Sequence, residues 1–233
     1  MVAAASTPTN HTRTTNAQWN YSAVVVGMPG VGKTTLQGSL IRRHLTTTAG
    51  IVLAHDPMGQ FTRDGCRFYK DASAYRAAAA AAGREGKKLP RGASIGGLNS
   101  DAVTELACEL GAKMNTAERV TCPILVPFDE GSLREGSGST YVSDLDNRIL
   151  STRRHLGVGL VLNVQECKQL MARWYQMSTD LYLFKQTRDR ARLLDGYAQF
   201  EQGSLESWGV TTLEEHRYLH VRPGKGLVAD SAL

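Results

Sequence analysis

The sequence predicts an α/β fold in which a mostly parallel central sheet is flanked by helices on both faces. Short apolar, β-branched runs alternate along the chain with longer segments whose apolar residues recur at helical spacing. No repeat or linker divides the chain, so we expect a flexible N-terminal arm over 1–20 and a single domain over 21–233. The 233 residues, 42% hydrophobic and 21% charged, suffice to bury a core.

The first third of the chain predicts strands and helices in alternation. The run 22–26 is β-branched and stops at glycines, as is typical of a buried strand that leads into a tight turn. Apolar residues at helical spacing then predict a helix over 33–45, and the apolar run 51–53 predicts a second buried strand. A short strand at 67–69 and an Ala-rich helix over 72–82 follow, since Ala has the highest helix propensity.

The rest of the chain continues the alternation. Glycines and prolines predict loops, apolar runs predict strands, and helical periodicity predicts helices. The expected elements are, in order, a loop over 83–97, a helix over 100–114, a strand at 124–128, a mobile Gly- and Ser-rich loop over 131–140, a helix over 142–156, strands at 159–163 and 181–184, a basic helix around 188–192 and a final strand at 218–221. The role of 222–233 stays open, and Gly224-Lys225-Gly226 is a candidate for a simple turn, a pore loop or a tail that docks on a neighbour.

Composition excludes some classes of protein. No apolar run approaches the roughly 20 residues of a membrane helix, so we expect no membrane span. The N-terminal 20 residues lack the apolar segment of a secretory signal. The four cysteines are far apart and form no metal-ligand pattern, which predicts reduced thiols and no structural zinc. The net charge of +5 is compatible with a polyanionic partner, and equally with a solvated basic surface.

The segment 27–34, GMPGVGKT, matches the phosphate-binding loop pattern GxxxxGK[ST]. Its glycines let backbone N–H groups curl around an anion, and the helix that follows offers its positive dipole end. We expect ATP with Mg²⁺ here, with Lys33 on the β- and γ-phosphates and Thr34 on the metal. The residues predicted to bind the nucleotide are Gly27, Pro29, Gly30, Val31, Gly32, Lys33, Thr34 and Thr35.

Polar residues follow two other predicted strands. The strand 124–128 delivers Asp129 and Glu130 to the edge of the sheet where ligands bind in parallel sheets. We expect Asp129 to bind Mg²⁺ and the nucleotide, and Glu130 to act as general base on water. Two acids at the start of a loop are the simpler interpretation if this pair is taken alone. Gln165, after the strand 159–163, is a candidate γ-phosphate sensor or water-positioning residue, or a simple helix cap.

Arginines at the end of the helix before that strand are candidates for a finger that acts on the γ-phosphate of a neighbouring subunit. Arg153 and Arg154 are favoured, and Arg148 competes for the role. The alternative is a cation that stabilises a helix C-terminus.

The order of these motifs resembles the FtsK–HerA superfamily of DNA-pumping P-loop ATPases over residues 20 to 225. The resemblance rests on GMPGVGKT, on HDP at 55–57, on ILVPFDE at 124–130, on the Arg-rich helix end with His155 and Gly157, on the strand ending in Gln165, and on STD at 178–180 before the strand 181–184. The compact size is most like the genome-packaging ATPases of tailless, membrane-containing, tectivirus-like viruses. The membrane helices and winged-helix reader of FtsK-type pumps and the barrel of HerA-type proteins have no counterpart here.

The resemblance implies a RecA-like ASCE core and a motor that packages double-stranded viral DNA into a preformed capsid. It further implies a homo-oligomeric ring, a hexamer, in the host cytoplasm and on the virion at the packaging vertex, beside capsid or membrane-associated packaging proteins. The DNA contacts expected on flexible basic loops are Arg84, Lys87, Lys88, Arg91 and Arg134. A solvated loop is the alternative for this cluster.

Other functions stay open at this stage. The alternatives are an assembly or secretion ATPase of the zonula-occludens-toxin type, a small P-loop kinase and a scaffold that binds nucleotide without turnover. A Glu directly after the Asp favours an ATPase that activates water over a kinase or a small GTPase.

Overall fold

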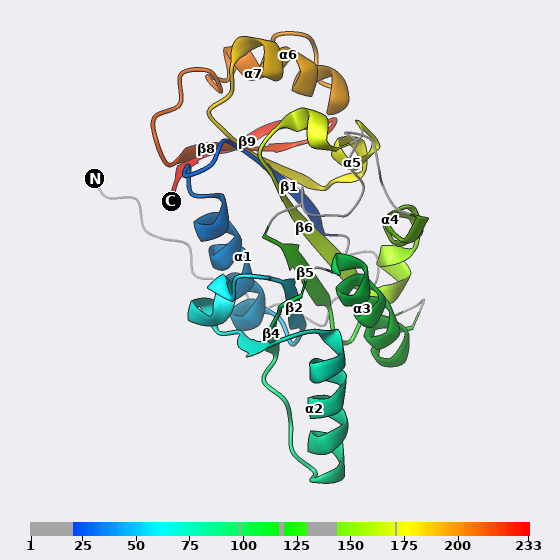
Figure 1. Cartoon of the computed structure of the whole chain (residues 1–233). Coiled ribbons are helices and arrows are strands. Elements are labelled where there is room, and N and C mark those ends of the chain that lie inside the picture. The colour runs from blue at the N-terminus through cyan, green and yellow to red at the C-terminus, as the bar shows by residue number, and fades with distance from the viewer. Residues whose placement is uncertain (1–20, 98, 117–118, 130–143, 171) are drawn as a thin grey trace, which may run out of the picture.

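A computed structural model of the chain describes residues 21–97, 99–116, 119–129, 144–170 and 172–233. One nine-stranded sheet runs through them, in the order β3-β4-β2-β5-β6-β1-β7-β8-β9 (Figure 1). The strands are β1 (Ser22–Val26), β2 (Ile51–His55), β3 (Arg67–Tyr69), β4 (Gly92–Ile95), β5 (Ile124–Phe128), β6 (Val158–Val164), β7 (Asp180–Phe184), β8 (Arg217–Arg222) and β9 (Gly226–Ala232).

The helices lie between these strands in the chain. They are α1 (Lys33–Thr47), α2 (Ala72–Arg84), α3 (Ser100–Met114), α4 (Asp144–Leu156), α5 (Ala172–Met177), α6 (Arg188–Tyr197) and α7 (Ser204–Ser207), with short 3-10 helices η1 (Gln60–Asp64) and η3 (Cys167–Gln169). All pairings from β3 to β7 are parallel, and β8 and β9 add an antiparallel edge. The predicted mostly parallel α/β sheet is therefore confirmed.

Both faces of the central strands are buried, which explains their continuous apolar runs. In β1, Ala23 and Val25 face a core that α1 and η1 complete, while Val24 and Val26 face a larger core. Side chains of α2 to α7 complete the larger core. Each fully buried Val contributes about 1.5–3 kcal/mol of transfer free energy.

Two strands escaped the sequence analysis. The segment 83–97 was expected to be a loop throughout, and this is wrong, because β4 lies within it. A Cβ on Gly92 would lie 2.7 Å from the carbonyl oxygen of Gly65, so a glycine at the start of β4 lets the chain pass close to its neighbour. The C-terminal segment forms β9, which pairs antiparallel with β8.

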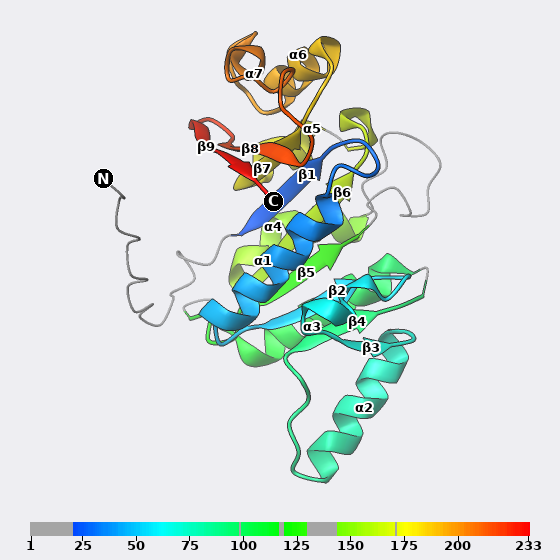
Figure 2. The ribbon, with the colours of Figure 1, turned by 90° about the vertical axis from the view of Figure 1, so that its left-hand side faces the viewer.

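The helix α2 and its return segment project from the body beyond the β3 edge of the sheet (Figures 1 and 2). We call α2 and residues 85–91 the α2 arm. The helices α6 and α7 lie at the other end of the molecule, beside β8 and β9. The carboxyl ends of the parallel strands β1, β2, β5 and β6 meet at one edge between these two ends, where ligands bind in such sheets.

Candidate active site

The phosphate loop joins the end of β1 to the start of α1, as the sequence predicts. Gly32 adopts φ +101°, in the left-handed region that favours glycine. A Cβ on Gly27 would lie 2.8 Å from Val31 Cγ2 and 2.9 Å from Phe184 Cβ, so the loop closes tightly at its base. Of the residues predicted to bind nucleotide, the eight between Gly27 and Thr35 lie on this loop or in the first turn of α1, and Asp129 follows β5.

Lys33 extends over the loop that precedes it. Its ammonium group donates hydrogen bonds to the carbonyl oxygens of Gly27, at 2.7 Å, and of Met28, at 2.9 Å. A positive charge is thereby held above a loop rich in backbone N–H groups, which is the arrangement an anionic phosphate requires.

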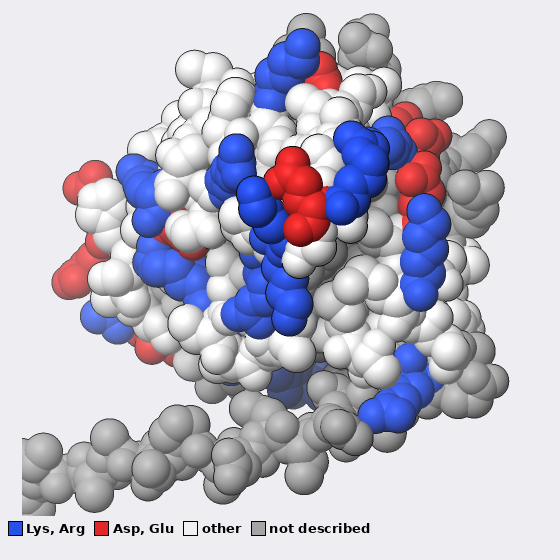
Figure 3. Space-filling model, turned by 90° about the horizontal axis from the view of Figure 1, so that it is seen from below, with Lys and Arg blue, Asp and Glu red and all other residues white. Residues whose placement is uncertain are grey.

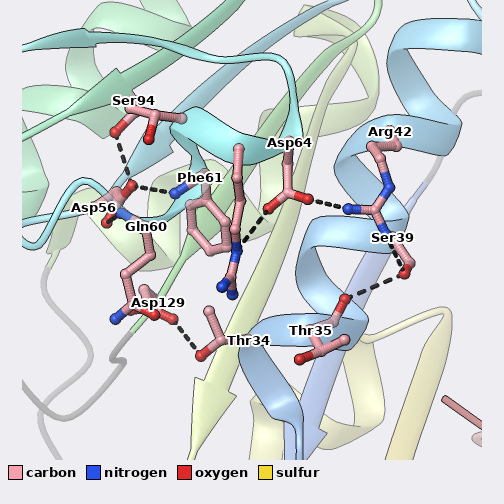
Figure 4. A network of polar contacts seen from close by, with 12 residues as sticks. Thr34, Thr35, Ser39, Arg42, Asp56, Gln60, Phe61, Asp64, Ser94 and Asp129 are labelled. Atoms are coloured by element: carbon pink, nitrogen blue, oxygen red, sulfur yellow. Dashed lines mark hydrogen bonds and ion pairs between the residues drawn. The ribbon is translucent and has the colours of Figure 1, made fainter.

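A direct contact joins the phosphate loop to the acidic strand end. Thr34 Oγ1 donates to Asp129 Oδ1 at 2.8 Å, although the two residues are 95 positions apart (Figure 4). The backbone N–H of Asp129 donates to the carbonyl of His55 at the end of β2, which fixes where the acid lies. A hydroxyl and a carboxylate oxygen side by side at a phosphate loop fit Mg²⁺, which prefers few protein oxygens together with phosphate oxygens.

Gln60 is a site residue that the sequence analysis missed. Its side-chain amide donates to Asp129 Oδ2 at 3.0 Å, so both carboxylate oxygens of Asp129 have a donor. The buried Asp56 holds η1 in place by accepting from the backbone N–H groups of Gln60 and Phe61 and from Ser94 Oγ (Figure 4). HDP at 55–57 marked this turn in the sequence, but the direction of Gln60 depends on the docking of η1.

The strand β6 lies between β1 and β5, so Gln165 follows the strand that separates the phosphate loop from Asp129. The carbonyl of Val164 accepts from the N–H of Gly27, and the N–H of Gln165 donates to Gln169 Oε1 at 2.8 Å. Gln165 follows a buried strand, as the sequence predicts, and its role as sensor stays a prediction.

A buried amide network lies beneath the site. Gln37, on α1 and fully buried, donates to the carbonyl oxygens of Phe128 at 3.0 Å and Val161 at 3.1 Å. Its Oε1 accepts from Asn163 Nδ2 at 3.0 Å. One side chain thus ties the helix that follows the phosphate loop to both β5 and β6.

The two favoured arginines differ in environment. Arg153 is buried, and its guanidinium donates to the carbonyls of Tyr21, at 3.1 Å, and Met177, at 2.7 Å. Burial, with a smaller effect of neighbouring Arg154, lowers the pKa of Arg153 to about 10. Arg154 is exposed. Arg153 therefore stabilises the fold of its own chain. Arg154, whose side chain is exposed, is the better candidate for an arginine finger that contacts the nucleotide of a neighbouring subunit.

Some predicted residues lie outside the described part of the chain. These are Glu130 and Arg134, together with the side chain of Arg148. The predicted loop 131–140 also falls there. The general-base, DNA-contact and finger roles proposed for these residues stay predictions.

The basic cluster divides into two parts. Arg84, Lys87 and Lys88 are exposed on the α2 arm, where Lys87 forms an ion pair of 2.8 Å with Glu85. Figure 3, seen from below, shows Lys and Arg side chains gathered on this side of the molecule. Arg91 instead donates to the carbonyls of Leu45 and Thr48. Its guanidinium caps the C-terminal end of α1, a favourable place for a cation.

Comparison with solved structures identifies proteins of the same fold. The genome packaging NTPase B204 from Sulfolobus turreted icosahedral virus 2, in complex with AMPPCP, superposes with a TM-score of 0.68 and 15% identity, over 92% of this chain and 99% of that one. The chain has the fold of this ATP-binding protein, a mostly parallel sheet with a phosphate loop.

Two further structures support this conclusion. B204 from Sulfolobus Turreted Icosahedral Virus, a DNA-packaging ATPase, gives a TM-score of 0.66 at 15% identity over 92% of this chain and 98% of that one. The pCW3 conjugation coupling protein TcpA, with ATPγS, gives 0.59 at 15% identity over 93% of this chain and 61% of that one. No family model and no curated protein matches the chain.

Within the described residues, no helix has both the length and the apolarity to cross a membrane. In the same part of the chain, no three His, Cys, Asp or Glu side chains lie together as a metal site.

Proposed function

We propose that the protein is an ATP-hydrolysing motor that translocates double-stranded viral DNA into a preformed capsid. The observation that carries the proposal is the contact between Thr34 and Asp129. It joins a complete phosphate loop to an acidic strand end, in a chain whose fold is that of a DNA-packaging ATPase over nearly the full length of both proteins.

In this proposal each residue of the site has its own role in binding or hydrolysing ATP. Lys33 and the loop N–H groups hold the β- and γ-phosphates, and Thr34 and Asp129 hold Mg²⁺. Bound Mg²⁺ supplies charge neutralisation on the phosphates. Glu130, next to Asp129 in the chain, accepts the proton of the attacking water, and Gln165 orients that water or contacts the γ-phosphate. Gln60 keeps the Asp129 carboxylate turned toward Thr34.

Assembly completes the site in this proposal. Arg154 belongs to α4, whose end precedes β6 and therefore lies at the edge of the sheet opposite the phosphate loop. Such a residue serves a neighbour's nucleotide rather than its own, which is how a ring couples its subunits. We propose a homo-oligomeric ring, a hexamer, that works in the host cytoplasm and at the packaging vertex of the virion.

The DNA contacts proposed are the exposed cations Arg84, Lys87 and Lys88 of the α2 arm. A packaging motor must hold phosphates without reading bases, and lysines and arginines on a projecting arm suit that task. Arg91, which caps α1, is a weaker candidate than the other three.

The first test measures ATP turnover of the purified protein with and without linear double-stranded DNA, beside Glu130→Gln. We expect DNA to stimulate turnover and the variant to abolish it. An ATP turnover rate that DNA does not change would favour an assembly ATPase. Turnover that requires a small-molecule acceptor would favour a kinase.

The second test addresses the α2 arm. Changing Lys87 and Lys88 to Ala should weaken DNA binding and reduce the slope of log K against log salt by about 2, because each phosphate contact contributes about 0.9 to the slope. Arg76→Ala is the matched control, since Arg76 lies on the helix of the same arm but pairs at 2.8 Å with Glu109 of α3, in the body of the domain. An unchanged slope in the double variant would contradict the assignment.

A further inference from the structure

Three arginines lie in the first turns of α6, at positions 188, 190 and 192. Cations are unfavourable there, because the helix N-terminus carries partial positive charge. Arg188 and Arg192 are compensated by one acid, Glu206 of α7, at 3.2 Å each. Arg190 turns the other way, toward the phosphate loop. Arg190 is thus a cation at a helix N-terminus without a partner on α7, and such departures from local preference are often found at functional sites.

Arg190 contacts two segments of the candidate active site. Its Nη2 donates to Glu166 Oε1 at 2.7 Å, and Glu166 directly follows Gln165. Its Nη1 lies 3.0 Å from the sulfur of Met28, the second residue of the phosphate loop. Lys33 contacts the carbonyl of this same Met28 at 2.9 Å. Two cations from different helices therefore converge on one residue of the loop.

The ion pair with Glu166 can be exchanged for another. About half of the Glu166 side chain is exposed, so the pair is not locked in the core. Both carboxylate and phosphate accept charge-assisted hydrogen bonds from a guanidinium, and a phosphate with more than one negative charge attracts it more strongly because the Coulomb energy grows with charge. The turn that carries Glu166 is itself fixed, because Gln169 Oε1 accepts from the backbone N–H groups of both Gln165 and Glu166.

We propose that Arg190 is a γ-phosphate contact within the same chain, and that Glu166 holds it when no triphosphate is bound. This inference rests on the nucleotide site proposed above and adds a residue to it. On binding of a triphosphate, Arg190 leaves Glu166 and pairs with the terminal phosphate. A diphosphate lacks that group, so the ion pair with Glu166 persists. Arg190 thereby makes the protein bind triphosphate more tightly than diphosphate. Competition from Glu166 for Arg190 limits the size of this difference in affinity.

The test compares the dissociation constants of AMPPCP and ADP, measured by calorimetry on the full chain. Arg190→Gln should weaken AMPPCP binding about tenfold and change ADP binding by less than about twofold. Glu166→Gln should do the opposite and strengthen AMPPCP binding, because it frees Arg190. The amide keeps an oxygen for the N-terminal cap of η3 that Glu166 provides. Arg192→Gln, from the same helix, is the matched control and should change neither constant.

The two variants are expected to change AMPPCP affinity in opposite directions, and this distinguishes the proposal from its alternative. A merely structural ion pair would make Arg190→Gln and Glu166→Gln change in the same direction, and would affect both nucleotides equally. That result, or an unchanged ratio of the two constants in Arg190→Gln, overturns the inference and leaves the proposed function intact. If the wild-type chain binds neither nucleotide, the proposed function fails as well.

Discussion

Replacing Arg153 with Met should destabilise the fold, whereas the same change at Arg154 should not. Met keeps most of the aliphatic length of Arg153 but removes the donors to the carbonyls of Tyr21 and Met177. A hydrogen bond to a charged group contributes about 1.5–3 kcal/mol. Part of that loss is recovered, because the guanidinium no longer has to be buried, an unfavourable effect that also lowers its pKa. We expect the free energy of unfolding to fall by about 2–4 kcal/mol.

Urea denaturation followed by circular dichroism measures this loss, and an unchanged m-value would show that compactness is preserved. Arg154→Met, on the exposed side of the same turn, should change stability by less than about 0.5 kcal/mol. It should still bind nucleotide, but it should lower turnover of the assembled protein. A stable Arg153→Met protein that has lost turnover would refute the reasoning and return the finger role to Arg153.

Two further predictions concern the site and the core. Gln60→Ala should raise the Mg²⁺ concentration for half-maximal turnover about tenfold, because Asp129 loses an orienting donor; nucleotide binding without Mg²⁺ should not change, and a parallel loss there would contradict this role. Burial lowers the pKa of His44 to about 4, so between pH 6.5 and 4 the unfolded chain binds a proton that the folded one does not. The free energy of unfolding should therefore fall by up to about 3 kcal/mol as the pH drops through that window. His44→Gln should flatten this dependence, and an equal slope in both proteins would refute it.

The elements that the sequence predicts well are those with both faces buried. In β1 and β5 every residue is buried, and nearly all of them are apolar, so the sequence shows where these strands begin and end. In β4 the requirement is close approach, which selects Gly92, Ala93 and Ser94 and produces a segment that resembles a loop.

The same distinction holds at the candidate site. Lys33, Thr34 and Asp129 belong to local motifs that follow β1 and β5, so the sequence alone could single them out, and the structure brings Thr34 and Asp129 into contact. Gln60 and Arg190 reach the site only through the docking of η1 and α6, which no local pattern encodes. Arg153 and Arg154 are neighbours in the chain, and only the tertiary structure distinguishes the buried one from the exposed one.

The amide of Gln37 has a mechanical consequence. It bonds the helix that carries Lys33 and Thr34 to the strand that ends at Asp129 and to the strand that ends before Gln165. Because these bonds are fully buried, shearing the helix against either strand would expose several unpaired amides and carbonyls at once, at about 1–3 kcal/mol each. The phosphate loop, Asp129 and β6 are therefore held together as one rigid unit. Movement that accompanies nucleotide binding must therefore occur outside this unit, in elements that these three bonds do not hold.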